Sequence, residues 1–213
     1  MMSTLAQAGI VVGGTRVIYY SNKPDATISV INKETTVPYL IQAWVDPFDK
    51  TDTSKPPFTV IPPVSRLEAQ QEKVLRIIKT QGELPKDRES VFWLNIKNIP
   101  PASDREKTNT LEIAVKTRIK FFWRPAEIKD TPESVVLKLK WQIQNQKLVV
   151  TNPSAIHINV MDVAVDGKDV PLNIIRPFET LTLPLPSGVS GKSLLWHFIN
   201  DYGAISKDIK IKL

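Results

Sequence analysis

Proline limits how this 213-residue chain can fold more than any other residue does. It occurs 17 times, against 8 glycines. Because proline breaks helices and central strands, it collects at strand ends, sheet edges and linkers. No 15-residue window keeps the 3.6-residue period of an amphipathic helix, although residues 67–78 fit it weakly. The sequence therefore predicts an all-β chain with many rigid corners.

The β-favouring runs fall into two sets. About seven runs precede residue 125, the number expected of an immunoglobulin-like sandwich, and the longest covers residues 110–123. A turn-rich segment, Lys129-Asp130-Thr131-Pro132, reads as a linker, and a smaller set follows that begins with an expected strand over 135–141. We expect two immunoglobulin-like β-sandwich domains in tandem, over residues 9–128 and 129–213.

Composition excludes several classes of protein. A hydrophobic fraction of 42% is too high for a disordered chain. The net charge of +6 is spread thinly, with no basic cluster, which indicates a solvated surface and no nucleic-acid partner. No stretch approaches the roughly 18 apolar residues of a membrane helix, so the chain is expected not to be membrane-embedded. With no cysteine, thiol nucleophiles and disulfides are excluded.

Residues 1–8 allow two interpretations. They end in Ala6-Gln7-Ala8, the small-x-small pattern that signal peptidase cuts. They are either the remnant of a secretory signal peptide, with a mature start at Gly9, or a terminus in which the pattern is accidental. The residues themselves favour neither interpretation.

Convergent reactive groups are missing from the sequence. Metalloprotease, hydrolase, P-loop and dinucleotide motifs do not occur. His157 and His197 are expected to be partly buried strand residues rather than ligands or bases. We therefore predict no enzyme, no cofactor and no metal site, and a hydrolase on a β scaffold has only these two histidines in its favour.

The run from Asn109 to Pro125 is the most informative part of the chain. Leu111, Ile113, Val115 and Ile119 share one face of an extended strand, and charged residues occupy the other. The pattern alone favours an apolar face that lines the domain's own core. The alternative is that this face is offered to a partner whose sheet lacks a strand.

Several separated stretches resemble a known family, the periplasmic pilus-assembly chaperones of the chaperone–usher pathway. Together they span nearly the whole chain. They are Val37-Pro38-Tyr39-Leu40-Ile41-Gln42-Ala43-Trp44, Pro62-Pro63-Val64-Ser65-Arg66-Leu67, Leu84-Pro85-Lys86-Asp87-Arg88-Glu89-Ser90, Ile99-Pro100-Pro101, Ile119-Lys120-Phe121-Phe122-Trp123-Arg124-Pro125 and Ile199-Asn200-Asp201-Tyr202-Gly203.

The resemblance implies two immunoglobulin-like domains in an L-shaped arrangement and a periplasmic chaperone that needs no cofactor. Such a chaperone binds pilin subunits by donor-strand complementation and delivers them to an outer-membrane usher. By position, Leu111, Ile113 and Val115 would be the inserting side chains, with Asn109 at the start of the series. Whether the free chaperone covers this strand by self-association is left open.

The resemblance also implies an anchor for the pilin's terminal carboxylate, made by Arg16 and Lys120. Lys120 is five residues from Val115, so in a regular strand it projects from the opposite face. A bulge, or a cleft reached from that other face, would then be needed. Glu89, Arg124 and Asp201 match a charged set that links the two domains in this family.

Two departures from the family pattern stand out. The connection over residues 100–109 is short, as in the branch that serves rod-like pili, and the second domain lacks the cysteine pair of some relatives. The alternative function is an extracellular two-domain adhesion or binding module, in which the alternating apolar face is buried internally. Exposure of Leu111, Ile113 and Val115 in the free monomer distinguishes the two hypotheses.

Overall fold

The computed structural model describes residues 9–101 and 113–213, and the chain divides into two compact units. The first unit comprises Met1–Leu84 and Val91–Phe122, and the second comprises Pro85–Ser90 and Trp123–Leu213. The two interpretations of residues 1–8 concern positions outside the described ranges. Each unit is an all-β sandwich, as the sequence predicts, and each is described by itself below.

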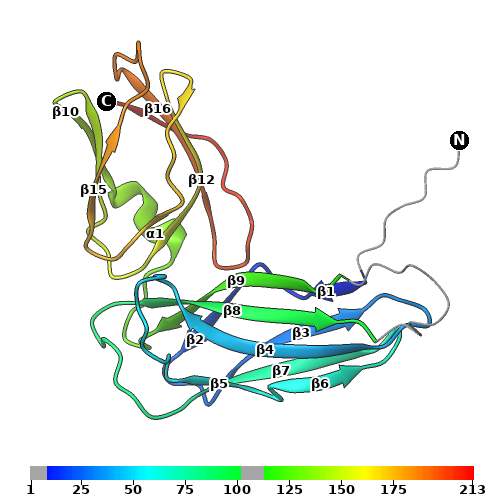
Figure 1. Cartoon of the computed structure of the whole chain (residues 1–213). Helices are drawn as coiled ribbons and strands as arrows, with labels where there is room; N and C mark the ends of the chain where they lie inside the picture. The colour runs from blue at the N-terminus through cyan, green and yellow to red at the C-terminus, as the bar shows by residue number, and fades with distance from the viewer. Residues whose placement is uncertain (1–8, 102–112) are drawn as a thin grey trace, which may run out of the picture. The chain divides into compact units, whose positions relative to one another are not determined.

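Two sheets form the first unit and lie as separate layers (Figure 1). One has the strand order β1-β3-β7-β5, and the other has the order β2-β9-β8-β4-β6. The strands are β1 (Ile10–Val12), β2 (Arg16–Tyr20), β3 (Ala26–Asn32), β4 (Tyr39–Pro47), β5 (Phe58–Ile61), β6 (Val64–Leu67), β7 (Glu72–Lys79), β8 (Ser90–Ile99) and β9 (Val115–Arg124).

Alternation along the strands builds the core of the first unit. On β4 and β8, Ile41, Ala43, Leu94 and Ile96 are buried, and their neighbours in sequence face outward. The Phe121 ring meets the Phe58 ring edge-on, with 4.7 Å between centroids. The outer face of the β2-β9-β8-β4-β6 sheet is therefore set by residues between these core positions, and it carries the site described below.

The first strand of the fold changes sheets at a pair of glycines. β1 pairs with β3 in one sheet, and β2 pairs within the other sheet. Between them, the Gly13 amide donates a hydrogen bond to the Ser29 carbonyl at 2.8 Å. A Cβ at Gly13 would collide with the Ser29 side chain, so glycine allows this close approach. The crossing places Arg16 at the start of β2.

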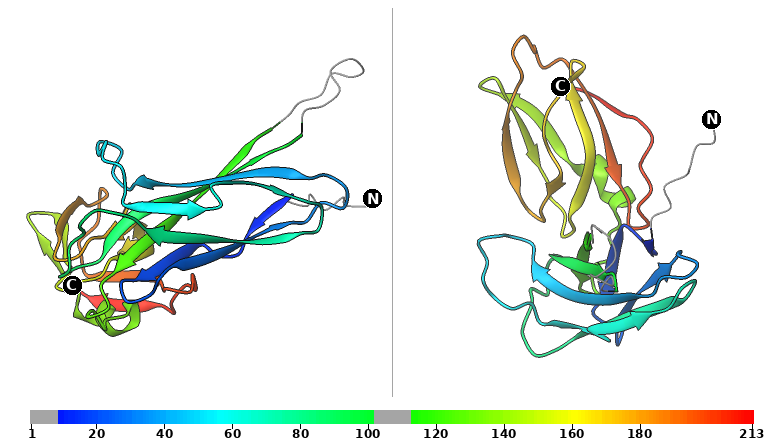
Figure 2. Two further views of the ribbon diagram at one scale, coloured as in Figure 1. Left: turned by 90° about the horizontal axis from the view of Figure 1, so that it is seen from below. Right: turned by 45° about the vertical axis from the view of Figure 1, so that its right-hand side comes forward.

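The second unit has a three-stranded sheet, β10-β11-β15, and a sheet ordered β13-β12-β16-β17 with β14 paired to β12 (Figure 2). Trp196 lies fully buried in its core beside Trp141. The strands are β10 (Lys140–Gln144), β11 (Lys147–Thr151), β12 (Ile158–Val165), β13 (Lys168–Asp169), β14 (Ile174–Ile175), β15 (Thr180–Pro184), β16 (Ser193–Ile199) and β17 (Ile209–Lys212).

One predicted element is wrong. The expected strand over 135–141 begins as helix α1 (Pro132–Val135) and a 3-10 turn, η1 (Val136–Lys138), because Thr131 and Ser134 form a capping box and Pro132 fits the first helical position. Residues 67–78 fit a helical period only weakly, and residues 72–78 belong to strand β7. In the described ranges, no helix is long and apolar enough to cross a membrane.

Leucines of the second unit offer a matched test of core packing. Leu148 is fully buried, and Leu137 is 81% exposed. We expect Leu148→Ala to lower the free energy of unfolding by about 2–5 kcal/mol because it leaves a cavity. Leu137→Ala should change it by less than about 0.5 kcal/mol. Urea denaturation of both variants measures the difference, and equal effects would contradict this assignment of the core.

Candidate functional site

Strand β9 is paired along only part of the edge that faces β2. It lies between β8 and β2 in its sheet, but β9 has ten residues and β2 has five. Residues 113–116 are exposed, and residues 121–125 are buried. The N-terminal half of β9, with residues 113 and 114 before it, therefore presents free backbone groups along one edge.

Apolar side chains on this free half point the same way as the core. Ile119 and Phe121 are buried in the first unit, and Val115, on the same face of the strand, is 51% exposed. Ile113 is 63% exposed. The paired ends of β8 and β9 extend away from the other strands of the unit (Figure 2, left). The exposure of Ile113 and Val115 shows that no sheet of the described residues covers them. Asn109 and Leu111, the other two predicted donor residues, lie outside the described residues.

The structure brings the predicted anchor residues together. Arg16 begins β2, Lys120 lies on the adjacent strand β9, and both are half-buried. Burial and the positive charge of Arg16 lower the pKa of Lys120 to about 8. No carboxylate among residues 9–101 and 113–213 forms an ion pair with the Lys120 ammonium. An anion bound near both cations would offset the repulsion between them.

Lys120 lies between buried Ile119 and Phe121, so it projects from the outer face of the sheet. Arg16 precedes buried Val17 and projects from the same face of β2. Lys120 and Val115 therefore lie on opposite faces of β9, as the sequence predicts, and both cations project from the outer face of the sheet. The exposed apolar side chains and the cations use opposite faces of one strand.

Further along the outer face, Arg118 is held by groups from two neighbouring strands. Its Nε donates to Asn95 Oδ1 at 2.9 Å, and its Nη2 lies 3.5 Å from Asp46 Oδ2. Its guanidinium carbon lies 5.3 Å from the centre of the Trp93 ring. The sequence does not reveal this cluster, because it depends on the register between β4 and β8. That register pairs Asp46 with Trp93 and Trp44 with Asn95.

The predicted charged set Glu89, Arg124 and Asp201 forms one hydrogen-bonded network. Arg124 Nε donates to Glu89 Oε1 at 2.7 Å, and its Nη1 and Nη2 donate to Asp201 at 2.6 and 2.9 Å. Glu89 and Arg124 are almost fully buried. All three belong to the second unit. The role of linking domains, which the resemblance implies, stays a prediction.

His157 is a fourth member of this network. Its backbone N–H donates to Glu89 Oε2 at 2.9 Å, and its Nδ1 lies 2.9 Å from the same oxygen. Burial alone would raise the pKa of Glu89, but the His157 hydrogen bonds and the Arg124 charge outweigh burial and lower it. This carboxylate therefore stabilises the fold above its ordinary pKa of 4.5, and the contribution is lost as pH falls through the lowered value.

The second histidine, His197, is not part of the buried network and contacts two exposed carboxylates. His197 Nδ1 contacts Asp162 at 2.6 Å, and its Nε2 contacts Asp208 at 3.2 Å. These two hydrogen bonds raise the pKa of His197. Within the residues that the structure describes, no group of three or more acidic, histidine or cysteine side chains could hold a metal ion.

Removing the centre of the charged network should destabilise the chain strongly. Arg124→Met leaves the Glu89 carboxylate buried without its cation, so we expect the free energy of unfolding to fall by about 3–5 kcal/mol. Arg66→Met is the matched control, because the Arg66–Glu68 pair is exposed, with side-chain exposures of 67% and 56%. That pair should contribute about 0–1 kcal/mol. Equal losses in urea denaturation would contradict a stabilising role for the network.

Comparison with known proteins places the chain in a family. A model described as the pili and flagellar-assembly chaperone, PapD N-terminal domain, matches residues 9–129. A second, the pili assembly chaperone PapD, C-terminal domain, matches residues 134–210. The chain is 36% identical to the probable fimbrial chaperone LpfB of Escherichia coli O157:H7 over 212 aligned residues. The alignment covers 98% of this chain and 90% of LpfB.

Other relatives agree. The chaperone protein FimC of Escherichia coli K12 is 34% identical over 208 residues, which cover 97% of this chain and 85% of FimC. The solved structure of the Salmonella enterica SafA pilin in complex with the SafB chaperone matches with a TM-score of 0.85 and 38% identity, over 96% of each chain. The chain thus belongs to the PapD family of pilus-assembly chaperones.

Proposed function

We propose that this chain is a periplasmic chaperone that captures pilin subunits by donor-strand complementation and delivers them to an outer-membrane usher. The observation that carries the proposal is the free half-edge of β9, whose apolar side chains are exposed. A pilin that lacks a strand can pair its backbone with this edge and receive Ile113 and Val115 in its open core. Each buried side chain would contribute about 1.5–3 kcal/mol before association costs.

The cation pair fixes where the captured strand ends. In our proposal, the pilin's terminal carboxylate binds Arg16 and Lys120 from the outer face of the sheet. Beyond Lys120, β9 is buried, so a strand anchored there can extend only toward residue 113. It must then run parallel to β9, with its carboxyl end at Lys120. Asn109 and Leu111 would continue the donor series toward the other end of this strand.

Delivery to an usher, the periplasmic location and self-association of the free chaperone rest on family membership rather than on a contact in this chain. We propose the first two as properties of a pilus-assembly chaperone. Self-association is a route by which a free monomer could cover Ile113 and Val115, which are exposed apolar residues on an unpaired edge. We also propose a domain boundary at 128/129, supported by family models that end at 129 and begin at 134.

The alternative function, an extracellular adhesion or binding module, requires the alternating face to be buried within its own domain. Ile113 and Val115 are instead 63% and 51% exposed. In the described part of this run, residues 113–125, the first buried side chain is that of Ile119. The exposed half of the strand therefore favours the chaperone over the module.

Loss of either anchor cation should prevent pilin capture. We expect Arg16→Ala and Lys120→Ala each to abolish recovery of soluble pilin when chaperone and pilin are co-expressed and pulled down, because the terminal carboxylate loses its charge-assisted hydrogen bonds. Lys116→Ala, which removes an exposed cation from the same strand, should retain recovery. Wild-type recovery with both anchor variants would overturn the anchor.

Pilin affinity should fall as the solution becomes more alkaline. Lys120 has a pKa of about 8 in the free chain, and only its charged form binds a carboxylate strongly. Between pH 7 and pH 9 we expect about a tenfold loss of affinity, because about nine-tenths of the lysine is then neutral. Lys120→Arg keeps its charge over this range, so its affinity should stay nearly constant. A wild-type affinity that does not change with pH would contradict this protonation step.

A further inference from the structure

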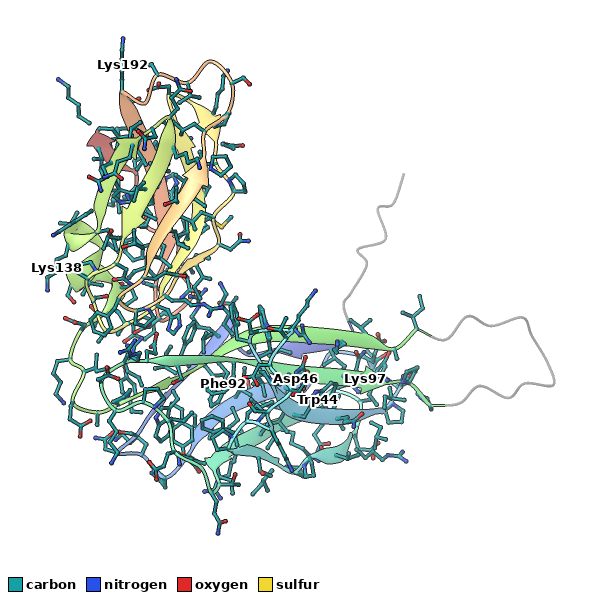
Figure 3. The ribbon with its side chains drawn as sticks, turned by 60° about the vertical axis from the view of Figure 1, so that its left-hand side comes forward. Trp44, Asp46, Phe92, Lys97, Lys138 and Lys192 are labelled. Carbon is teal, nitrogen blue, oxygen red and sulfur yellow. The ribbon has the colours of Figure 1, made fainter. Side chains whose placement is uncertain are left out.

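Arg118, on the outer face of β9, contacts side chains of two neighbouring strands. Its guanidinium crosses two strands, from β9 over Asn95 and Trp93 on β8 to Asp46 on β4. Asn95 is fully buried, and its Nδ2 also donates to Asp46 Oδ2 at 3.0 Å. Figure 3 labels Asp46 together with Trp44 and Lys97 on these neighbouring strands. The guanidinium plane is therefore fixed by the first unit alone, before any partner binds.

These contacts use only part of the guanidinium. Nε is bonded to Asn95, and Nη2 has a long contact to Asp46, but Nη1 has no hydrogen-bond partner among the described residues. The Arg118 side chain is 34% exposed, so a ligand can reach it. Lys116, on the same face, is exposed and makes no ion pair with any residue that the structure describes. Arg118 thus presents oriented donors, whereas Lys116 presents a flexible charge.

The spacing between Arg118 and Lys120 determines which residue of a bound pilin strand would lie beside Arg118. The two residues are two apart on one face of β9, about 6.6 Å along the strand. A parallel strand whose terminal carboxylate binds Lys120 advances by the same spacing. Its third residue from the end therefore projects beside Arg118, on the face opposite to the one that receives Val115.

We propose that Arg118 is a specificity-determining residue that selects pilins with an acidic side chain at the third position from their carboxyl terminus. This inference rests on the proposed function, since it needs the terminal carboxylate at Lys120. A Glu or Asp there accepts a hydrogen bond from Nη1 without displacing Asn95. A cation at the same position is disfavoured by Arg118 and Lys120 together.

Asp46 limits the strength of this selection. Its carboxylate lies 3.5 Å from Nη2 and partly neutralises the guanidinium. Replacing it with asparagine removes the competing charge but keeps an oxygen that Asn95 can bond. Asp46→Asn should therefore increase the preference for an acidic ligand, the opposite effect to removing Arg118.

Designed peptides test the proposal directly. We would measure, at pH 7, the affinity of the whole chain for two fluorescently labelled 12-residue peptides with alternating apolar residues and a free carboxyl terminus, one with Glu and one with Gln at the third position from the end. We expect the Glu peptide to bind about fivefold more tightly to the wild-type chain. Arg118→Gln should reduce this ratio to about one, and Lys116→Gln should leave it within twofold.

Other arms separate this inference from the proposed function. Amidating the peptide carboxyl terminus should abolish binding if the Lys120 anchor is correct. Binding that needs the free carboxylate but shows no Glu preference overturns the role of Arg118 alone, and the absence of any peptide binding overturns both. If Arg118→Gln folds poorly, Asp46→Asn decides: a ratio that rises about threefold supports the proposal, and a ratio that is unchanged or falls contradicts it.

Discussion

The incomplete pairing of β9 is the constraint from which the rest of the site follows. Its C-terminal half closes the first sandwich with β2 and β8, where Ile119 and Phe121 are buried. Its N-terminal half continues in the same alternation, but among the residues that the structure describes no strand pairs with its free edge and no sheet covers its apolar face. The buried half gives the exposed half its direction and register, so the chain offers a strand whose geometry is already set.

The charged residues of this molecule form two different kinds of group, a paired buried network and a pair of like charges. The buried carboxylate of Glu89 has a full set of donors from Arg124 and His157, and Asp201 completes the bonding of the guanidinium. Such a network stabilises the fold and resists change. Arg16 and Lys120 are instead two cations that repel each other, and burial together with the charge of Arg16 lowers the pKa of Lys120. That repulsion is relieved when an anion binds, so it favours a ligand of opposite charge.

Much of this arrangement could be predicted from the sequence, for identifiable reasons. Prolines and short β-favouring runs predicted the all-β class, and the alternation that includes Val115 and Ile119 placed Lys120 on the opposite face. Alternation could not show that Ile119 is buried while Val115 is exposed, because that depends on where the opposite sheet ends. The contact of His157 with Glu89 joins residues 68 apart, and α1 depends on a capping box that was hidden in a turn-rich segment.

The two faces of β9 carry independent information about the same partner. Apolar residues at alternate positions on one face suit an open hydrophobic groove, and Arg118 and Lys120 on the other suit anions spaced by two residues. A shift of one residue would put every partner side chain on the wrong face. A shift of two residues would preserve the apolar fit but place the terminal carboxylate beside Arg118, two residues away from Lys120, so it would lose the paired cations Arg16 and Lys120. The cation pair therefore distinguishes registers that hydrophobic contact alone cannot.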